Sequence, residues 1–232
     1  HNHTWVAKVA QWFSRWSGDT IVLVGEEIHS TDYHLLAIGI RNTIDWRQPA
    51  TNAIDDVHRQ GGVTIAAHPT ARYTAYDAQA LQELDGAEVV HPIGLRSPAL
   101  AAQLREFYGR TQLTAIGNTD YHFGPLSPHL GVMGLCRTYL FVRERSERGV
   151  LEALRAGRTL AYDREQVYGD PAMIQLANAD GRLPQLALAG IPRHFTSSLS
   201  RIFGVLGLLA CTLSCGGTWG RVRSCSRPGE PV

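Results

Sequence analysis

The sequence predicts an α/β protein of alternating strands and helices, and three observations support this class. Short, uncharged apolar runs recur along the chain, as is typical of strands buried on both faces. Between several of these runs lie segments with apolar residues at helical spacing, often ended by glycine. The connections are short. Together these patterns favour a mostly parallel sheet or barrel with helices outside it.

The composition is that of a soluble globular protein. Of the 232 residues, 44% are hydrophobic and 19% are charged, which is enough to form one sizeable core. The formal net charge is +1, and the charges are interspersed, so the chain carries no specific nucleic-acid signature. The four cysteines include no Cys-x-x-Cys pair, which argues against a zinc ribbon.

The first elements are a helix and a hairpin. Residues 4–17 predict an amphipathic helix, and we expect its stripe of tryptophans to face the core. The run 21–24 predicts a strand that ends before Glu27, and the run 34–40 predicts a second strand. If the two strands form a hairpin, Glu27 and His34 become neighbours.

Helices and strands then alternate to about residue 157. Asp77 and Ser97 are expected helix N-caps. The expected helices are 51–60, 77–84, 97–109 and 146–157, and the expected strands are 63–67, 87–90, 113–116 and 138–142. In such folds the chemistry gathers at the carboxyl ends of the strands.

Residue types that bind metals follow several of these strands. His34 begins a strand, but the hairpin is expected to bring it to the edge where the first strand ends. The others are Glu27, His68, His91, Asp120 and His122. Imidazole and carboxylate suit zinc, manganese or iron, so their repeated occurrence at one expected rim predicts a metal site.

These residues occur in motifs whose order and approximate spacing resemble the PHP (polymerase and histidinol phosphatase) family. The motifs are His1-Asn2, Gly25-x-Glu27, His34-Leu35-Leu36, Gly61-Gly62 to His68-Pro69, Asp120-x-His122 and Ala156-Gly157-Arg158-Thr159. The resemblance implies a distorted (β/α)7 barrel over residues 1–165. It also implies two or three divalent metal ions (Zn, Mn or Fe) and hydrolysis of a small-molecule phosphoester or other ester by a metal-bound hydroxide.

The resemblance also implies roles for individual residues. It makes Glu27 a carboxylate that bridges two metals, and it makes Asp120 and His122 ligands of a first and a third metal. We expect Glu27 and Asp120 to be the catalytic carboxylates as well. The ligands that it implies are His1, Glu27, His34, His68, Asp120 and His122.

The sequence departs from the family at its start. The opening His-x-His pair on the first strand is missing, and His1 resembles the histidine of the second motif instead. We therefore expect a barrel that lacks its first strand, an incomplete first metal site and a natural protein that begins earlier. A non-catalytic module of the same fold, with a structural or regulatory metal, is the alternative function.

Three rim residues are candidates for binding substrate. Arg72 and Arg96 follow His68-Pro69 and His91-Pro92, and arginine binds phosphate oxygens through paired hydrogen bonds. A solvated role is the alternative for the two arginines. For His91 the alternative is a hydrogen-bonded core histidine.

The pattern changes after residue 165. We expect residues 166–200 to form a linker or extension and residues 201–232 to hold an apolar segment and a basic tail. The charge-free stretch 202–220 approaches the roughly 20 residues that a membrane span requires. A membrane anchor, a helix packed on the barrel and a disordered end stay open, so the expected location is cytoplasmic or membrane-anchored.

Overall fold

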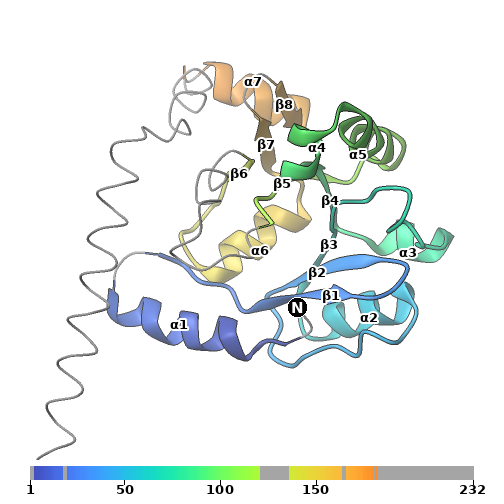
Figure 1. Ribbon diagram of the computed structural model, residues 1–232. Helices are drawn as coiled ribbons and strands as arrows, with labels where there is room; N and C mark the ends of the chain where they lie inside the picture. Colours follow the sequence, from blue (N-terminus) through green and yellow to red (C-terminus); the bar gives the residue numbers. More distant parts are fainter. Residues whose placement is uncertain (1–2, 18–19, 121–135, 164–165, 180, 182–232) are drawn as a thin grey trace, which may run out of the picture. The chain divides into compact units, whose positions relative to one another are not determined.

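Five strands that neighbour one another in chain order form the main sheet (Figure 1). The computed structural model describes residues 3–17, 20–120, 136–163, 166–179 and 181. The strands are β1 (Gly25–His29), β2 (His34–Ile38), β3 (Val63–Ala66), β4 (Gly86–Val90) and β5 (Thr114–Gly117). β1, β2 and β3 pair antiparallel, whereas β3, β4 and β5 pair parallel. The chain therefore has the expected α/β class, but the parallel arrangement is limited to three strands of this sheet.

A second, antiparallel sheet lies beside β5. It contains β6 (Arg137–Leu140), β7 (Thr159–Asp163) and β8 (Gln166–Gly169). The Thr159 hydroxyl donates to the carbonyl oxygen of Ala115 at 2.8 Å, and the backbone N–H of Gly117 donates to Thr138 Oγ1 at 2.8 Å. At these positions threonine side chains join strands that are not paired as neighbours in one sheet. The described strands thus form two sheets, and the expected barrel is not seen as one closed sheet.

Helices pack on both faces of the main sheet, α2 and α5 on one and α6 on the other. The described helices are α1 (Trp5–Ser17), α2 (Ala50–Arg59), α3 (Ala78–Glu83), α4 (Pro92–Arg96), α5 (Pro98–Thr111), α6 (Glu147–Arg155) and α7 (Pro171–Ala179). Ile54 of α2 and Phe107 of α5 belong to a core cluster that includes Ala66 of β3. Val63 and Ile65 of the same strand belong to a cluster with Leu154 of α6. Because successive strand residues point to opposite faces, β3 is buried on both.

Several sequence predictions of local structure are confirmed. The side chains of Asp77, Ser97 and Ser146 each accept a hydrogen bond from a backbone N–H at the start of α3, α5 and α6. The hairpin of β1 and β2 also forms. Strongly patterned helices and tight hairpins depend on nearby residues, which explains why they are predictable.

The first strand lies later in the chain than predicted. The apolar run 21–24 precedes β1, which begins at Gly25 and includes Glu27. Glu27 is paired with Leu36 of β2, so it lies within the strand and not beyond its end. Pairing with β2 therefore continues through residues whose polarity suggested that the strand had stopped.

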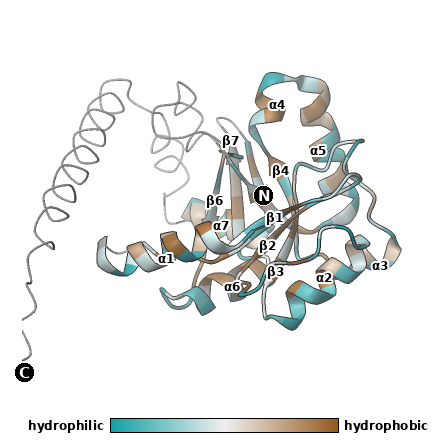
Figure 2. Ribbon diagram, turned by 60° about the horizontal axis from the view of Figure 1, so that its bottom comes forward, coloured by the Kyte–Doolittle hydropathy of each residue, from teal (hydrophilic) through white to brown (hydrophobic). Residues whose placement is uncertain are grey.

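The helix α1 presents its apolar side outward, which contradicts the expected core-facing stripe. Trp5, Trp12 and Trp16 are 64%, 55% and 78% exposed. The polar side faces the protein, since Gln11 Nε2 donates to Val22 O at 2.9 Å and to a Glu147 carboxylate oxygen at 3.0 Å. Figure 2 shows apolar and polar residues alternating along this helix.

Part of the expected linker 166–200 is folded. Residues 166–169 form β8, which pairs with β7, and α7 follows it. These elements are short, and α7 has no pronounced polar face, so their pattern did not predict them. Within the described ranges no helix is long and apolar enough to cross a membrane, and the candidate anchor 202–220 lies outside those ranges.

Candidate metal centre

One face of the main sheet carries polar side chains toward the end where β3, β4 and β5 finish. Glu27 is paired with Leu36, and Leu36 with Ile65, so these three side chains share a face. His34 lies two residues before Leu36 on the same face. Glu88 also lies there, because it is two residues beyond Gly86, the partner of Ile65. Strand register alone therefore brings two carboxylates and an imidazole to one region.

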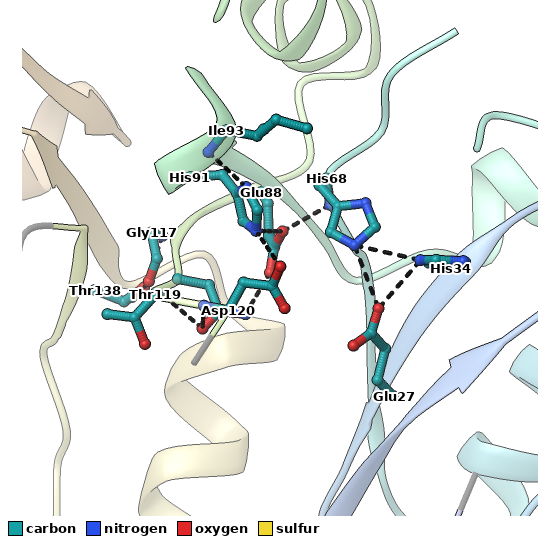
Figure 3. A network of polar contacts seen from close by, with 11 residues as sticks. Glu27, His34, His68, Glu88, His91, Ile93, Gly117, Thr119, Asp120 and Thr138 are labelled. Carbon is teal, nitrogen blue, oxygen red and sulfur yellow. Dashed lines mark hydrogen bonds and ion pairs between the residues drawn. The ribbon is translucent and has the colours of Figure 1, made fainter. Parts of the chain in front are cut away.

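Three side chains point their donor atoms at one another (Figure 3). The nitrogen His34 Nδ1 lies 3.2 Å from Glu27 Oε1, and His68 Nε2 lies 3.3 Å from the same oxygen. The two nitrogens lie 3.3 Å apart. His34 and His68 are buried, and the Glu27 side chain is 13% exposed. This set of two imidazoles and one carboxylate fits a divalent transition metal.

The Glu27 carboxyl is held in its charged form. Burial by itself would raise the pKa of Glu27, but hydrogen bonds from His34 and His68 outweigh it and lower the pKa well below its ordinary value. Metal binding requires a deprotonated carboxylate, so the site provides the ionised ligand that a cation would need.

A second group of donor atoms shares His68 with the first. It consists of His68, His91 and Asp120, whose ligand atoms lie within 4.8 Å of one another. The nitrogen His91 Nε2 lies 3.4 Å from Asp120 Oδ2. The imidazoles of His68 and His91 have centres 5.1 Å apart. The structure thus holds two neighbouring candidate metal positions that meet at one histidine.

Among the described residues, the ring of His91 has a hydrogen bond at one nitrogen and none at the other. His91 is the N-cap of α4, and its Nδ1 atom accepts a hydrogen bond from the backbone N–H of Ile93 at 3.2 Å. The Nε2 atom is buried and has no hydrogen-bond partner in the described ranges, although Asp120 Oδ2 lies 3.4 Å away. It therefore stays a candidate donor atom of the second group.

Glu88, in the middle of β4, connects the segments that follow β3 and β5. It is fully buried, and its Oε2 atom accepts the backbone N–H of His68 at 2.6 Å. Its Oε1 atom accepts a hydrogen bond from Asn118 Nδ2, also at 2.6 Å. Burial raises the pKa of Glu88, although these contacts and the nearby histidines oppose the rise. Glu88 holds the segments after β3 and β5 in place beside the donor atoms.

Two candidate ligands have a left-handed backbone. The φ angles are +28° at His68 and +44° at Asp120. Non-glycine residues rarely adopt positive φ, and such strained positions cost about 1–3 kcal/mol and concentrate at functional sites. The Glu88 contact to the His68 N–H is one of the interactions that stabilise this conformation.

The structure brings together most of the predicted site residues that it describes. Glu27, His34, His68, His91 and Asp120 form the two groups. His1 and His122 lie outside the described residues. Arg72 and Arg96 are exposed, and no hydrogen bond or ion pair joins either of them to these groups in the described part of the chain. Arg72 does lie over the Tyr73 ring, with its Cζ atom 5.2 Å from the ring centre.

Sequence reasoning missed two contributors. The motifs of the sequence assign no site role to Glu88 or to Asn118. A glutamate inside the apolar strand Ala87-Glu88-Val89-Val90 is the signal that could have found the first, since a buried charge requires polar partners. Asn118 has no comparable local signal.

Comparison with solved structures finds a similar fold. The fold is similar to that of a two-domain protein from Bacteroides vulgatus. That crystal structure contains a predicted PHP-like metal-dependent phosphoesterase, and it superposes with a TM-score of 0.58 at 21% sequence identity. The match covers 75% of this chain and 54% of the other, so the chain spans about half the length of that protein. At this identity the likeness concerns the fold. No family model and no curated protein matches the chain.

Proposed function

We propose that this chain is a metal-dependent hydrolase of the PHP type that cleaves a small-molecule phosphoester. The observation that carries the proposal is the convergence of Glu27, His34 and His68 on one point at 3.2–3.3 Å. A buried set of imidazole and carboxylate donors is the usual first requirement of a catalytic metal site. The similar fold of a protein that contains a predicted phosphoesterase supports the same class.

Two or three ions, Zn, Mn or Fe, would be held by this chain. Glu27, His34 and His68 would bind one ion, and Asp120 would bind another with His68 close by. His1 and His122 are further proposed ligands. When bound, such ions supply Lewis acidity toward a phosphoryl oxygen and lower the pKa of a water molecule.

The remaining residues have separate roles in this proposal. His91, whose Nε2 atom lies 3.4 Å from Asp120 Oδ2 and has no hydrogen-bond partner among the residues that the structure describes, would contact the substrate beside the metals. Arg72, in the loop after β3, and Arg96, at the end of α4, would bind the phosphate. We also propose that the two described sheets belong to one distorted barrel. The threonine contacts between β5 and its neighbours support this arrangement.

The proposal is tested by metal binding and hydrolysis in the same protein. The chain is stripped with a chelator, loaded with Zn²⁺ or Mn²⁺, and assayed for metal content and for hydrolysis of p-nitrophenyl phosphate and p-nitrophenyl acetate. We expect bound metal and faster hydrolysis of the phosphate. Replacing Glu27→Gln or His68→Gln removes a ligand, so metal affinity should fall by more than the about 10–100-fold that loss of an outer-shell partner costs.

A matched histidine elsewhere serves as the control. His58 lies outside both donor groups, and its Nε2 atom is 2.9 Å from Asp85 Oδ2. The variant His58→Gln should therefore bind metal as the parent does. Equal metal binding by the parent, Glu27→Gln and His68→Gln would refute the proposed site. Bound metal without turnover of either ester would instead favour a structural or regulatory metal.

A further inference from the structure

The imidazole of His34 is packed between two aromatic rings. The centre of the Tyr73 ring lies 3.9 Å from that of His34, and the two planes are inclined by only 26°. The centre of the His29 ring lies 3.7 Å from that of His34, at an inclination of 53°. Two rings this close to one imidazole would overlap if they shared a face. Tyr73 and His29 therefore cover opposite faces of His34.

In the part of the chain that the structure describes, the Nε2 atom of His34 makes no hydrogen bond that would hold the ring in place. His34 is 3% exposed, and its Nε2 atom has no hydrogen-bond partner among the described residues. A histidine that binds a metal through one nitrogen usually donates the other N–H to a carboxylate or carbonyl, and this bond fixes the ring. At His34 the inner nitrogen faces Glu27 and His68, so the ring orientation must depend on another contact.

Tyr73 is held firmly over His34 by its own loop. Its backbone N–H donates to Thr70 O at 2.8 Å. The next residue, Thr74, forms an antiparallel bridge with Tyr33, which directly precedes His34. The N–H of Ala75 also donates to Asp32 O at 3.2 Å. The loop after β3 is thus attached to the turn between β1 and β2, and this attachment sets the tyrosine on the imidazole.

We propose that Tyr73 is a positioning residue, which with His29 fixes the His34 ring by aromatic packing in place of the usual hydrogen bond. Tyr73 also meets the edge of His68, whose ring centre is 5.4 Å away, so one side chain orients two candidate ligands. The inference rests on the proposed function, because it assumes that His34 binds a metal. It assigns the aromatic ring of Tyr73, and not its hydroxyl, to this task.

The test compares three versions of the full chain: the parent, Tyr73→Phe and Tyr73→Leu. Zn²⁺ and Mn²⁺ affinities are measured by calorimetry. Tyr73→Phe keeps the ring and should bind as the parent does, within about twofold, whereas Tyr73→Leu should bind about tenfold more weakly, as expected when an outer-shell partner is lost. If Tyr73→Phe loses as much affinity as Tyr73→Leu, or if neither loses any, the proposal is wrong.

A second measurement needs no metal. In the metal-free chain, the His34 ring protons are assigned with the variant His34→Gln, and their NMR shifts are compared among the three versions. Packing against an aromatic face moves these signals upfield. They should stay there in Tyr73→Phe and move downfield in Tyr73→Leu, and unchanged shifts in Tyr73→Leu would contradict the packing.

The opposite face offers an independent pair of variants. His29→Phe keeps an aromatic ring on His34, while His29→Ala removes it, so only His29→Ala should weaken metal binding. If Tyr73→Leu does not fold, this pair still tests whether aromatic packing on His34 supports metal binding. A parent chain that binds neither ion would refute the proposed function, and the ring shifts would still show whether Tyr73 packs on His34.

Discussion

The replacement Glu88→Gln tests the link between the buried carboxylate and the candidate ligands. Both oxygens of Glu88 accept hydrogen bonds at 2.6 Å, one from the His68 N–H and one from Asn118 Nδ2. The Asn118 amide cannot easily turn over, because its Oδ1 atom accepts the N–H of Thr119 at 2.7 Å. Glutamine has the same shape but only one acceptor. Its NH₂ group would therefore face one of the two donors.

The expected loss follows from this mismatch. Losing a hydrogen bond to a charged group, with a buried donor left unpaired, costs about 1.5–3 kcal/mol. Removing the buried charge offsets part of this, since burial raises the pKa of Glu88 and so disfavours the ion. We expect the free energy of unfolding to fall by about 1–3 kcal/mol in urea titrations followed by circular dichroism.

Metal binding should change as well. The N–H that Glu88 accepts belongs to His68, whose backbone is in the left-handed region. When that contact is lost, the imidazole is less well held against Glu27, and metal affinity should fall by about 10–100-fold. The control is Glu106→Gln, an exposed glutamate on α5, which should change neither quantity.

Two outcomes would refute the reasoning. If Glu88→Gln unfolds at the same urea concentration as Glu106→Gln, the two short contacts do not contribute as the structure indicates. If stability falls while metal affinity stays unchanged, Glu88 supports the fold but does not position His68.

The remaining predictions concern stability. The hydrogen bond to Asp85 raises the pKa of His58, so this pair stabilises the fold fully below the ordinary histidine pKa of about 6.5 and less as pH rises through the raised value. The stability difference between the parent and His58→Gln should therefore shrink above about pH 6.5 in urea titrations at several pH values, and a pH-independent difference would contradict this. Trp12→Ser, at a side chain 55% exposed, should change the free energy of unfolding by less than about 0.5 kcal/mol. Phe107→Ala, at a side chain 2% exposed, should lower the free energy of unfolding by about 3–5 kcal/mol in the same assay. If Trp12→Ser lowered it as much as Phe107→Ala does, α1 would belong to the core. Asp77→Ala should cost about 1 kcal/mol by removing the N-cap of α3, and Asp77→Asn should restore most of it in thermal melts.

Much of the local structure was predictable because its causes are local. The cap at Asp77 depends on a carboxylate that precedes a helical pattern. The approach of Glu27 and His34 depends on a short hairpin between two apolar runs. His68 and His91 could be placed near one rim because each lies within two residues of the end of a short strand, and these two strands pair parallel.

Other features depend on residues that are distant in sequence. The polar pair Glu26 and Glu27 suggested the end of a strand, yet both lie inside β1. Glu26 is accommodated because its Oε1 atom accepts the Ile44 N–H at 2.6 Å, and Glu27 because two histidines face it. Hydrophobicity along the chain cannot report such partners, so the predicted strand was too early.

Periodicity and nearest neighbours along the chain were enough to predict the alternation of strands and helices, the capped helices and the residue types at one rim. Tertiary contacts were needed to show which ring nitrogen of His91 has a backbone partner, because the N–H of Ile93 in α4 approaches Nδ1. The same holds for the contacts of Glu88 with the segments after β3 and β5, and for the outward orientation of the tryptophans of α1. The physical reason is the same in each case: a side chain's role depends on the partner that packing places against it, and no local pattern encodes that partner.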